Sequence, residues 1–553
     1  MNVSFGNPVG VGMRLKGKSG ATAAVLAAMV GLGLCGSGCG EYYRPVATPI
    51  VQPGGDTQPT RHALVVSRNG PCLTGTPADC TPGTAVIIDV AGDDVAGVFT
   101  GVAGIGRDPV HAVAPTGTDY IVNEVDNSVT PLILGDVGTV PGVISLPAPT
   151  PADPGIVPAV PVFAASAQGN LFVAESGRNM VAVIGLSTNT LNAEIPVGTN
   201  PRALVATPDG TQLYSLNQGD NTVTVILPNN NTVFETIPLP AGAGPVWGAV
   251  SSDGTRVFVV NQADSTVSVI NTITDMVVTT LAVGAGPNYI VYDPTLNRVY
   301  VTSPAGGSLS IIEDPTAVPP AVPTVTTVPL AGAPCNGTTP ISVTALADGT
   351  RAYVADQAGN SVCILSTTSD TFIKRICLVQ EPAVPGNPCP SSATPAFIAS
   401  DSDSFRVYTA NQYQTGPFAV SSICRGTTAP CLSSSAGVVT VTVTAAPFPF
   451  QVGQPVTISG VTSDASFNGV FGITSVAAAS NQFTYVQNGL PDSTPAVPGA
   501  AATAAVLPFI SLIQTANDTL VLNDNEATGN ANLITPPLTI DAGGTPTFIT
   551  MTP

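Results

Sequence analysis

Few residues of this chain have the types and spacing that catalysis or metal binding requires. His62 and His111 are its only histidines, and histidine is the usual acid–base group near neutral pH and the commonest metal ligand. Two histidines exclude a multi-histidine metal or haem site. The mature part also contains no G-x-S-x-G, Walker, H-E-x-x-H or C-x-x-C motif. We therefore expect no catalytic residue, metal or cofactor, and we expect both histidines to be structural, with His62 exposed.

A small set of side chains suits ligand binding instead, and each of them follows a proline by one or two positions. Arginine pairs with acidic groups, and tryptophan or tyrosine stacks on rings. The candidate ligand-binding residues are His111, Arg202, Trp247, Asn288 and Tyr289. The alternative for Trp247, the single tryptophan, is that it only fills space between neighbouring structural units. The recurrent acids Asp209, Asp253 and Asp348 precede glycine, and we expect them to stabilise turns rather than to bind calcium.

The elements that carry these residues repeat along the chain. TPDGTQLYSLNQGDNTVTVI at 207–226 is followed by SSDGTRVFVVNQADSTVSVI at 251–270, and further copies begin near 114, 166, 293, 346 and 401. The period is about 42 residues. Each copy contains a proline-led strand, an Asp-Gly type turn and three more short strands, which is typical of one propeller blade. The sequence predicts an all-β propeller in which the residues after each proline lie beside the central channel.

The motif resembles the YVTN repeat, in which DG-x-x-x-Y-V-x-N precedes a T-V-S-V-I-D-like strand. The chain is similar to the secreted YVTN-repeat (YncE-like) β-propellers over residues 62–411 and 506–553. The repeat count gives eight four-stranded blades, whereas the resemblance favours seven. The first copy lacks a proline-led strand and the chain ends with a spare one, TPTFITMTP at 545–553. We expect this C-terminal strand to complete the N-terminal blade and so remove an open edge.

Residues 412–505 interrupt the period within the last repeat. The segment 437–489 has alternating strands and Gly-Asn turns, which predict a small inserted all-β module. It resembles small modules of bacterial and phage adhesive proteins. Residues 490–505, rich in proline and alanine, are expected to form its exit linker.

The N-terminus carries basic residues followed by an apolar run from Ala21 to Leu34. Because the run is too short to span a bilayer, residues 1–38 are expected to be a secretory signal peptide. The end of this leader resembles a bacterial lipoprotein signal, which implies a lipid anchor on Cys39, although Gly36 stands where such signals usually carry leucine. The alternative is that both leader cysteines are discarded or unmodified. The Pro/Gly-rich segment 39–61 suits a tether.

Excluding Cys35 in the leader and Cys39 directly after it, eight of the ten cysteines remain, an even number. An even number in an exported chain favours disulfides. Short turn-rich loops predict the pairs Cys72–Cys80 and Cys424–Cys431. The remaining four cysteines allow three pairings, of which we favour Cys363 with Cys377 across a hairpin and Cys335 with Cys389 in equivalent loops.

Charge and composition narrow the function further. The formal net charge is −19, from 16 basic and 35 acidic residues, which excludes a nucleic-acid partner. We expect a monomeric, non-enzymatic, exported and lipid-anchored binding or scaffolding propeller at the bacterial cell envelope, whose partner is an envelope protein or a surface polymer. The alternatives are a lactonase-like hydrolase, an activity that some similar propellers have, and a structural surface-layer component.

Overall fold

The protein is described by a computed structural model, which covers part of the chain. The described residues are 62–69, 81–90, 94–100, 105–115, 117–133, 142–151, 153–314, 323–379, 388–389, 393–401, 406–427, 437–445, 448–487, 490, 501–520, 539–541 and 545–551. The expected signal peptide, the Cys39 anchor, the tether, the Cys72–Cys80 pair and Cys431 lie outside these ranges. Within them, no helix has the length and apolar character needed to cross a membrane.

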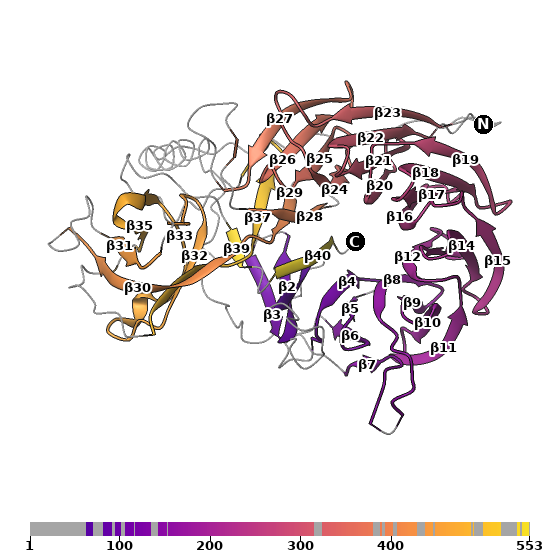
Figure 1. Ribbon diagram of the computed structural model, residues 1–553, viewed down its shortest axis with the longest axis horizontal. Coiled ribbons are helices and arrows are strands. Elements are labelled where there is room, and N and C mark those ends of the chain that lie inside the picture. The colour runs from indigo at the N-terminus through magenta and orange to yellow at the C-terminus, as the bar shows by residue number, and fades with distance from the viewer. Residues whose placement is uncertain are drawn as a thin grey trace, which may run out of the picture. The chain divides into compact units, whose positions relative to one another are not determined.

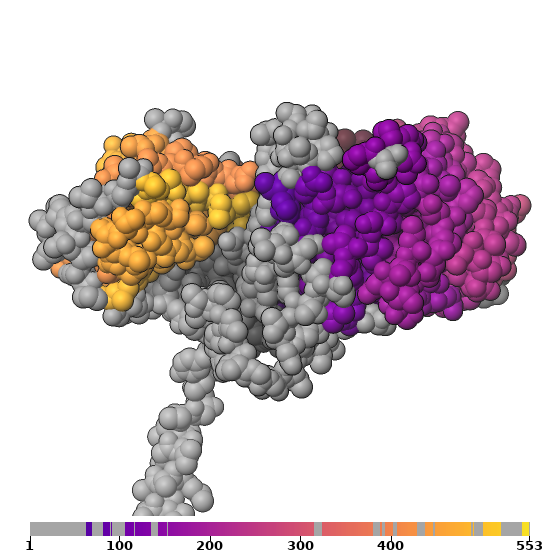
Figure 2. Space-filling model, turned by 90° about the horizontal axis from the view of Figure 1, so that it is seen from below, coloured from indigo at the N-terminus to yellow at the C-terminus, as the bar shows by residue number. Residues whose placement is uncertain are grey.

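Eight antiparallel sheets form the blades of a β-propeller (Figure 1). This confirms the repeat count rather than the seven blades that the resemblance favoured. The innermost strands of neighbouring blades contact one another in the closed order β40, β4, β8, β12, β16, β20, β24, β28 and back to β40. Figure 2 shows part of the rim, where the colour passes from indigo to magenta as one blade follows the next.

Blade 1 is built from both ends of the described chain. Its strands are β1 (His62–Asn69), β2 (Thr81–Asp89), β3 (Asp94–Thr100) and, innermost, β40 (Thr545–Met551). β1 pairs antiparallel with β40, from Ala63 opposite Met551 to Arg68 opposite Thr545. The predicted C-terminal closure is confirmed.

Blades 2 to 7 each take four consecutive strands, ordered from the channel outward. Blades 2 and 3 comprise β4 (Pro109–Val113), β5 (Thr118–Asn123), β6 (Ser128–Ile133), β7 (Ile144–Ser145), β8 (Pro161–Ala167), β9 (Asn170–Glu175), β10 (Met180–Gly185) and β11 (Thr190–Pro196). Blades 4 and 5 comprise β12 (Pro201–Ala206), β13 (Leu213–Asn217), β14 (Thr222–Leu227), β15 (Thr232–Pro238), β16 (Pro245–Val250), β17 (Arg256–Asn261), β18 (Thr266–Asn271) and β19 (Met276–Ala282). Blades 6 and 7 comprise β20 (Tyr289–Asp293), β21 (Arg298–Ser303), β22 (Ser308–Glu313), β23 (Thr324–Pro329), β24 (Pro340–Ala345), β25 (Arg351–Asp356), β26 (Ser361–Ser366) and β27 (Thr371–Cys377).

Blade 8 is interrupted along the chain but continuous in hydrogen bonding. It comprises β28 (Pro395–Ser400), β29 (Arg406–Asn411), β37 (Phe509–Gln514), β38 (Thr519–Leu520) and β39 (Thr539–Asp541). Asn411 at the end of β29 lies opposite Phe509 at the start of β37. The chain therefore leaves the blade after its second strand and returns as its third.

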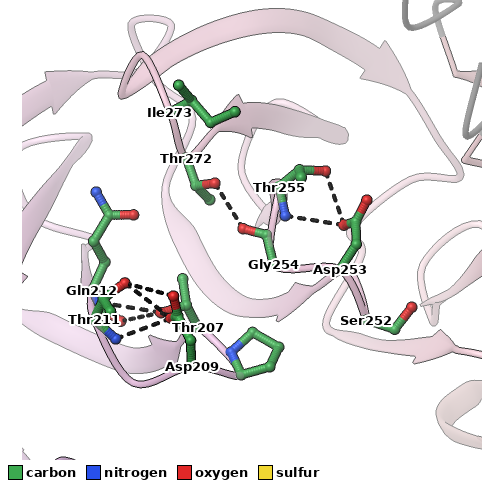
Figure 3. Close-up of a pocket in the computed structure, with 11 residues that line it drawn as sticks. Thr207, Asp209, Thr211, Gln212, Ser252, Asp253, Gly254, Thr255, Thr272 and Ile273 are labelled. Atoms are coloured by element: carbon green, nitrogen blue, oxygen red, sulfur yellow. Dashed lines mark hydrogen bonds between the residues drawn. The ribbon is translucent and has the colours of Figure 1, made fainter. Parts of the chain in front are cut away.

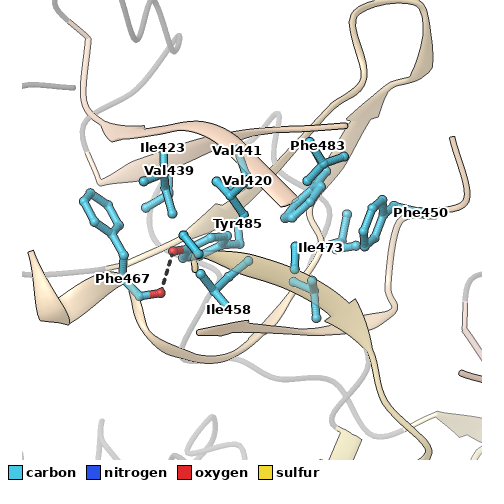
Figure 4. Packing of buried hydrophobic residues seen from close by; sticks show 14 of the residues in the cluster. Val420, Ile423, Val439, Val441, Phe450, Ile458, Phe467, Ile473, Phe483 and Tyr485 are labelled. Atoms are coloured by element: carbon cyan, nitrogen blue, oxygen red, sulfur yellow. Dashed lines mark hydrogen bonds between the residues drawn. The ribbon is translucent and has the colours of Figure 1, made fainter. Parts of the chain in front are cut away.

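The strands between β29 and β37 form a separate seven-stranded sheet. They are β30 (Thr415–Arg425), β31 (Val438–Val443), β32 (Pro455–Ser459), β33 (Gly469–Gly472), β34 (Ser475–Ala477), β35 (Gln482–Val486) and β36 (Thr503–Val506). Apolar side chains from these strands meet in one core of their own (Figure 4). The Tyr485 hydroxyl lies in this core and donates to the carbonyl of Phe467 at 3.4 Å.

Tyrosines link neighbouring blades at their second strands. Tyr120, Tyr214 and Tyr353 donate hydrogen bonds to Asn189, Asp275 and Asp518, each of which lies in a turn of the next blade and has a positive φ. In blade 3 the equivalent position is Phe172, which has no hydroxyl. The matching turn residue of blade 4, Asn231, has a buried Oδ1 with no hydrogen-bond partner. The blade 3–blade 4 interface therefore lacks one bond of this set.

Two disulfides lie within the described residues, and both differ from the pairing that we favoured. Cys335 is bonded to Cys363 and Cys377 to Cys389, with Cα–Cα distances of 5.5 and 5.4 Å. The favoured pair across the hairpin fails because of register: Cys363 lies opposite Arg375, so Cys377 is its diagonal neighbour. Diagonal Cα atoms are about 7–8 Å apart, beyond the usual reach of a disulfide. The pairing of Cys335 with Cys389 is wrong as a consequence.

Candidate functional site

The innermost strands share one local design at their first residues. Six of them, β4, β8, β12, β16, β24 and β28, begin with a proline followed by a register shift. In β16, for example, Pro245 lies opposite Asn261 and Trp247 opposite Val260, so that Val246 has no partner of its own. Such an extra residue is a β-bulge, which re-aims the side chains around it. Proline is tolerated there because it is the first residue of the strand.

The second residue after each proline is aromatic in six of the eight blades. These residues are His111, Phe163, Trp247, Tyr289, Phe397 and Phe548, and we call them the aromatic collar. Their ring centroids form a closed circuit, with successive distances of 3.9, 5.1, 5.0, 5.3, 4.7 and 4.4 Å in that order and back to His111. Contacts of this length are typical of packed aromatic pairs.

Two small residues complete the collar. Ala203 of blade 4 and Ser342 of blade 7 occupy the equivalent positions, and in each case the rings of the flanking blades contact one another across the gap. Trp247 also lies 6.5 Å from Phe548, ring centroid to ring centroid. These two residues come from blades 5 and 1, which are opposite in a ring of eight, so the rings meet at the channel axis.

The collar is uncharged over a wide pH range. His111 is buried, its Nδ1 accepts a hydrogen bond from the Ala164 amide at 3.4 Å, and burial lowers its pKa to about 3. Burial raises the pKa of Tyr289 to about 12. The expectation of a structural histidine fits this environment. His62, by contrast, was expected to be exposed, and that expectation is wrong: it is buried and bonded to Asp119 at 2.8 Å.

Charged side chains lie at the proline-side mouth of the channel. Arg202, the bulge residue of β12, is exposed, and Glu124 in the turn after β5 is half-buried. Burial raises the pKa of the Glu124 carboxyl and the Asp108 carboxylate adds to this, while Arg202 and Arg68 act in the opposite direction. Glu124 and Arg202 belong to blades 2 and 4. Both lie at the proline ends of their blades, since Arg202 follows the first residue of β12 and Glu124 follows the last residue of β5.

The five ligand-binding candidates divide into two groups in the structure. His111, Trp247 and Tyr289 are brought together in the collar, and Arg202 lies beside it at the mouth. Asn288 is engaged elsewhere, since its side chain donates to the Ile341 carbonyl at 2.7 Å and accepts from the Thr302 hydroxyl at 2.8 Å. Ligand binding by any of the five stays a prediction.

Sequence reasoning missed four residues of this region. Phe163, Phe397 and Phe548 belong to the collar, and the recurring pattern proline-x-aromatic could have identified all three. Glu124 had no such signal, because only the ring geometry brings its turn close to Arg202.

A second hollow lies away from the channel, between the Asp-Gly turns of blades 4 and 5 (Figure 3). Its volume is about 640 Å³. Asp209 and Asp253 line it, and each accepts bonds from the backbone and the hydroxyl of the threonine two residues on, Thr211 and Thr255. Their predicted role in stabilising turns is confirmed. Within the described part of the chain, no group of three acidic, histidine or cysteine side chains is placed to hold a metal.

Comparison with known proteins finds likeness in fold only. No protein-family model matches the chain, and no curated protein matches its sequence. Similar solved structures include the periplasmic gluconolactonase of Pseudomonas aeruginosa, with 16% identity, a TM-score of 0.43 and coverage of 60% of this chain and 98% of that one. Virginiamycin B lyase from Staphylococcus aureus has 15% identity and a TM-score of 0.41, with coverage of 55% of this chain and 92% of that one. Kuenenia stuttgartiensis hydrazine synthase has 20% identity and a TM-score of 0.42, with the same coverage of 55% and 92%. Likeness at this level says nothing about the activity of this chain, whose propeller architecture follows from its own sheet order.

Proposed function

We propose that this protein is an exported, non-enzymatic β-propeller that binds an acidic, ring-bearing ligand at the proline-side mouth of its channel. The observation that carries the proposal is the closed aromatic collar with the exposed Arg202 beside it. The collar offers aromatic surface on which a sugar or other ring stacks. Arg202 offers a planar donor group that matches a carboxylate in bidentate fashion.

The proposed location is the bacterial cell envelope. The disulfides Cys335–Cys363 and Cys377–Cys389 support export, because such bonds persist in oxidising compartments. We further propose that the leader is removed and that Cys39 carries a lipid anchor. Intact mass of the protein expressed in a bacterial host tests this: a lipid-sized addition that disappears in Cys39→Ala supports the anchor, and an unmodified, soluble product contradicts it.

Ligand binding is testable with the protein's own fluorescence, since Trp247 is the only tryptophan and lies in the collar. We expect titration with D-glucuronate to change Trp247 emission, and glucose, which has the ring without the carboxylate, to bind at least about tenfold more weakly. Arg202→Gln should reduce glucuronate affinity by a similar factor and leave that for glucose unchanged. A response that is equal for both sugars, or insensitive to Arg202→Gln, would contradict the proposal.

A lactonase-like hydrolase is the second candidate, and one specific observation favours it. Glu124 is a carboxyl whose pKa is raised by burial, and it interacts electrostatically with the Arg202 guanidinium. A raised carboxyl pKa suits general acid–base catalysis, and a nearby cation suits a developing oxyanion. Turnover of a sugar lactone by the natural chain that is lost in Glu124→Gln would support the enzyme. Absence of turnover together with glucuronate binding would support the binding protein.

A further inference from the structure

The rim of blades 4 and 5 exposes a group of apolar side chains that the channel does not use. They are Val233, Phe234, Ile273, Met276 and Val278, which are 40, 59, 80, 64 and 54% exposed. We call them the rim patch. They lie on or next to the outermost strands of blades 4 and 5, β15 and β19. Scattered single apolar residues are normal on a protein surface, whereas here five exposed ones gather on the outer strands of two neighbouring blades.

Backbone bulges turn two side chains of the rim patch outward, and the residue at such a bulge does not have to be apolar. β15 and β19 each contain a β-bulge, and the extra residues are Phe234 and Val278. The outer strand of blade 3, β11, has the same bulge, and there the extra residue is Asn192, which is polar and exposed. Bulges also protect an edge strand against the addition of another strand. A partner of the rim patch is therefore recognised by side-chain packing.

Carboxylates border the rim patch. Ile273 lines the hollow of Figure 3 together with Asp209 and Asp253, and Glu235 lies exposed on β15 next to Phe234. A hydrogen bond from Thr207, with others from Thr211, lowers the pKa of Asp209. Burial opposes the change at Asp253, but bonds from Ser251 and Thr255 still lower its pKa. Both groups therefore carry negative charge at neutral pH.

The cations of these two blades are outnumbered by carboxylates, and of the two only Arg256 contributes to lowering the pKa of Asp253. Between Pro201 and Ala282, a fully described stretch, the only basic residues are Arg202 and Arg256. Arg202 lies at the channel mouth. Arg256 is buried and paired with Asp314 of blade 6. The rim patch thus combines apolar surface with an excess of negative charge, since six acidic residues accompany the two arginines between Pro201 and Ala282.

We propose that the rim patch docks a basic segment of another protein. Apolar side chains of that segment pack on Phe234, Met276 and Val278. A lysine or arginine enters the hollow, where its methylene groups cover Ile273 and its charge meets Asp209 and Asp253. The proposal rests on charge complementarity and exposure at the rim, and it is independent of ligand binding at the channel.

The test uses a capped, fluorescently labelled peptide of alternating arginine and leucine, with binding followed by anisotropy at low salt. We expect the double variant Asp209→Asn, Asp253→Asn to weaken binding at least tenfold. Asp348→Asn is the matched control, because Asp348 accepts the same bonds from Thr350 in the equivalent turn of blade 7, and it should leave affinity unchanged. Equal weakening by the control, or no binding by the natural chain, would overturn the proposal.

The apolar half of the surface has its own test. We expect Ile273→Ser with Met276→Ser to weaken the arginine–leucine peptide at least fivefold. A peptide of arginine and serine with the same charge should bind the natural chain at least fivefold more weakly than the arginine–leucine peptide. Equal affinity for the two peptides would show attraction by charge alone and would overturn the docking surface.

Discussion

The axis and the rim of this propeller use the same backbone device and reach opposite results. A β-bulge near the start of the innermost strands accompanies the rings that meet in the collar, and a β-bulge in several outermost strands turns one side chain outward. At the axis eight strands converge, so the rings bury one another. At the rim the strands diverge, so Phe234 and Val278 stay exposed. Whether a side chain near a β-bulge is buried or exposed therefore depends on how many neighbouring strands converge on it. The bulge alone does not determine its exposure.

The largest expected effect comes from removing one ring at the axis. Phe548→Ala deletes a buried ring that contacts His111, Phe397 and Trp247. We expect a loss of about 3–5 kcal/mol in the free energy of unfolding, measured by denaturant titration. Trp247 emission should shift to longer wavelength as water enters. A loss below about 1 kcal/mol would mean that the aromatic collar does not stabilise the propeller.

Titration of a buried carboxyl gives the second effect. Glu175, at the end of β9, is fully buried and bonded to Arg178 at 3.1 Å. Burial, followed by the Glu194 carboxylate, raises its pKa to about 7, against the pull of Arg178. Because the folded pKa exceeds the unfolded value, the contribution of Glu175 to stability is complete at low pH and is lost as pH rises from about 4.5 to about 7, an effect of about 3 kcal/mol.

Glu175→Gln should flatten the dependence of unfolding free energy on pH across that window. Asp209→Asn is the matched change in an exposed carboxylate, which lies in the turn between β12 and β13. Hydrogen bonds lower the pKa of Asp209, so its contribution is present above the usual carboxyl range and is lost only in acid. A pH profile unchanged by Glu175→Gln would contradict the assignment.

The third effect concerns the interface between blades 3 and 4, midway between axis and rim. Phe172→Tyr places a hydroxyl where blades 2, 4 and 7 have one, opposite the unpartnered Oδ1 of Asn231. We expect stabilisation by about 1 kcal/mol. Tyr120→Phe removes the equivalent bond to Asn189 at the neighbouring interface and should cost a similar amount. The comparison fails if both variants change the unfolding free energy in the same direction.

The smallest effect is at the rim itself. Phe234→Ala removes a ring that is 59% exposed, so the free energy of unfolding should change by no more than about 0.5 kcal/mol. The same variant should weaken binding of the arginine–leucine peptide. Destabilisation as large as that of Phe548→Ala would contradict the conclusion that rings at the axis stabilise the fold and exposed rings at the rim do not.

The architecture was predictable because it repeats. Repeated motifs such as SSDGTRVFVVNQ specify blade number, and a spare strand at 545–553 specified closure through β40. The site was only half predictable. Recurring aromatics after prolines could be read from the sequence, but their contact across the axis depends on eight blades closing to one channel width. Disulfide pairing failed for a related reason, since it depends on a register of two residues between β26 and β27.

Closure through β40 also determines when the ring is complete during synthesis. The Thr547 hydroxyl donates to the Val66 carbonyl, a residue 481 positions earlier in the chain. A chain made N-terminus first therefore leaves β1 without its inner neighbour until β40 has been added, after all the other described strands. Long-range pairing of this kind slows folding and leaves strand edges open to misassembly. The first blade to be synthesised is thus the last to be finished, and the collar, which needs Phe548, forms only with it.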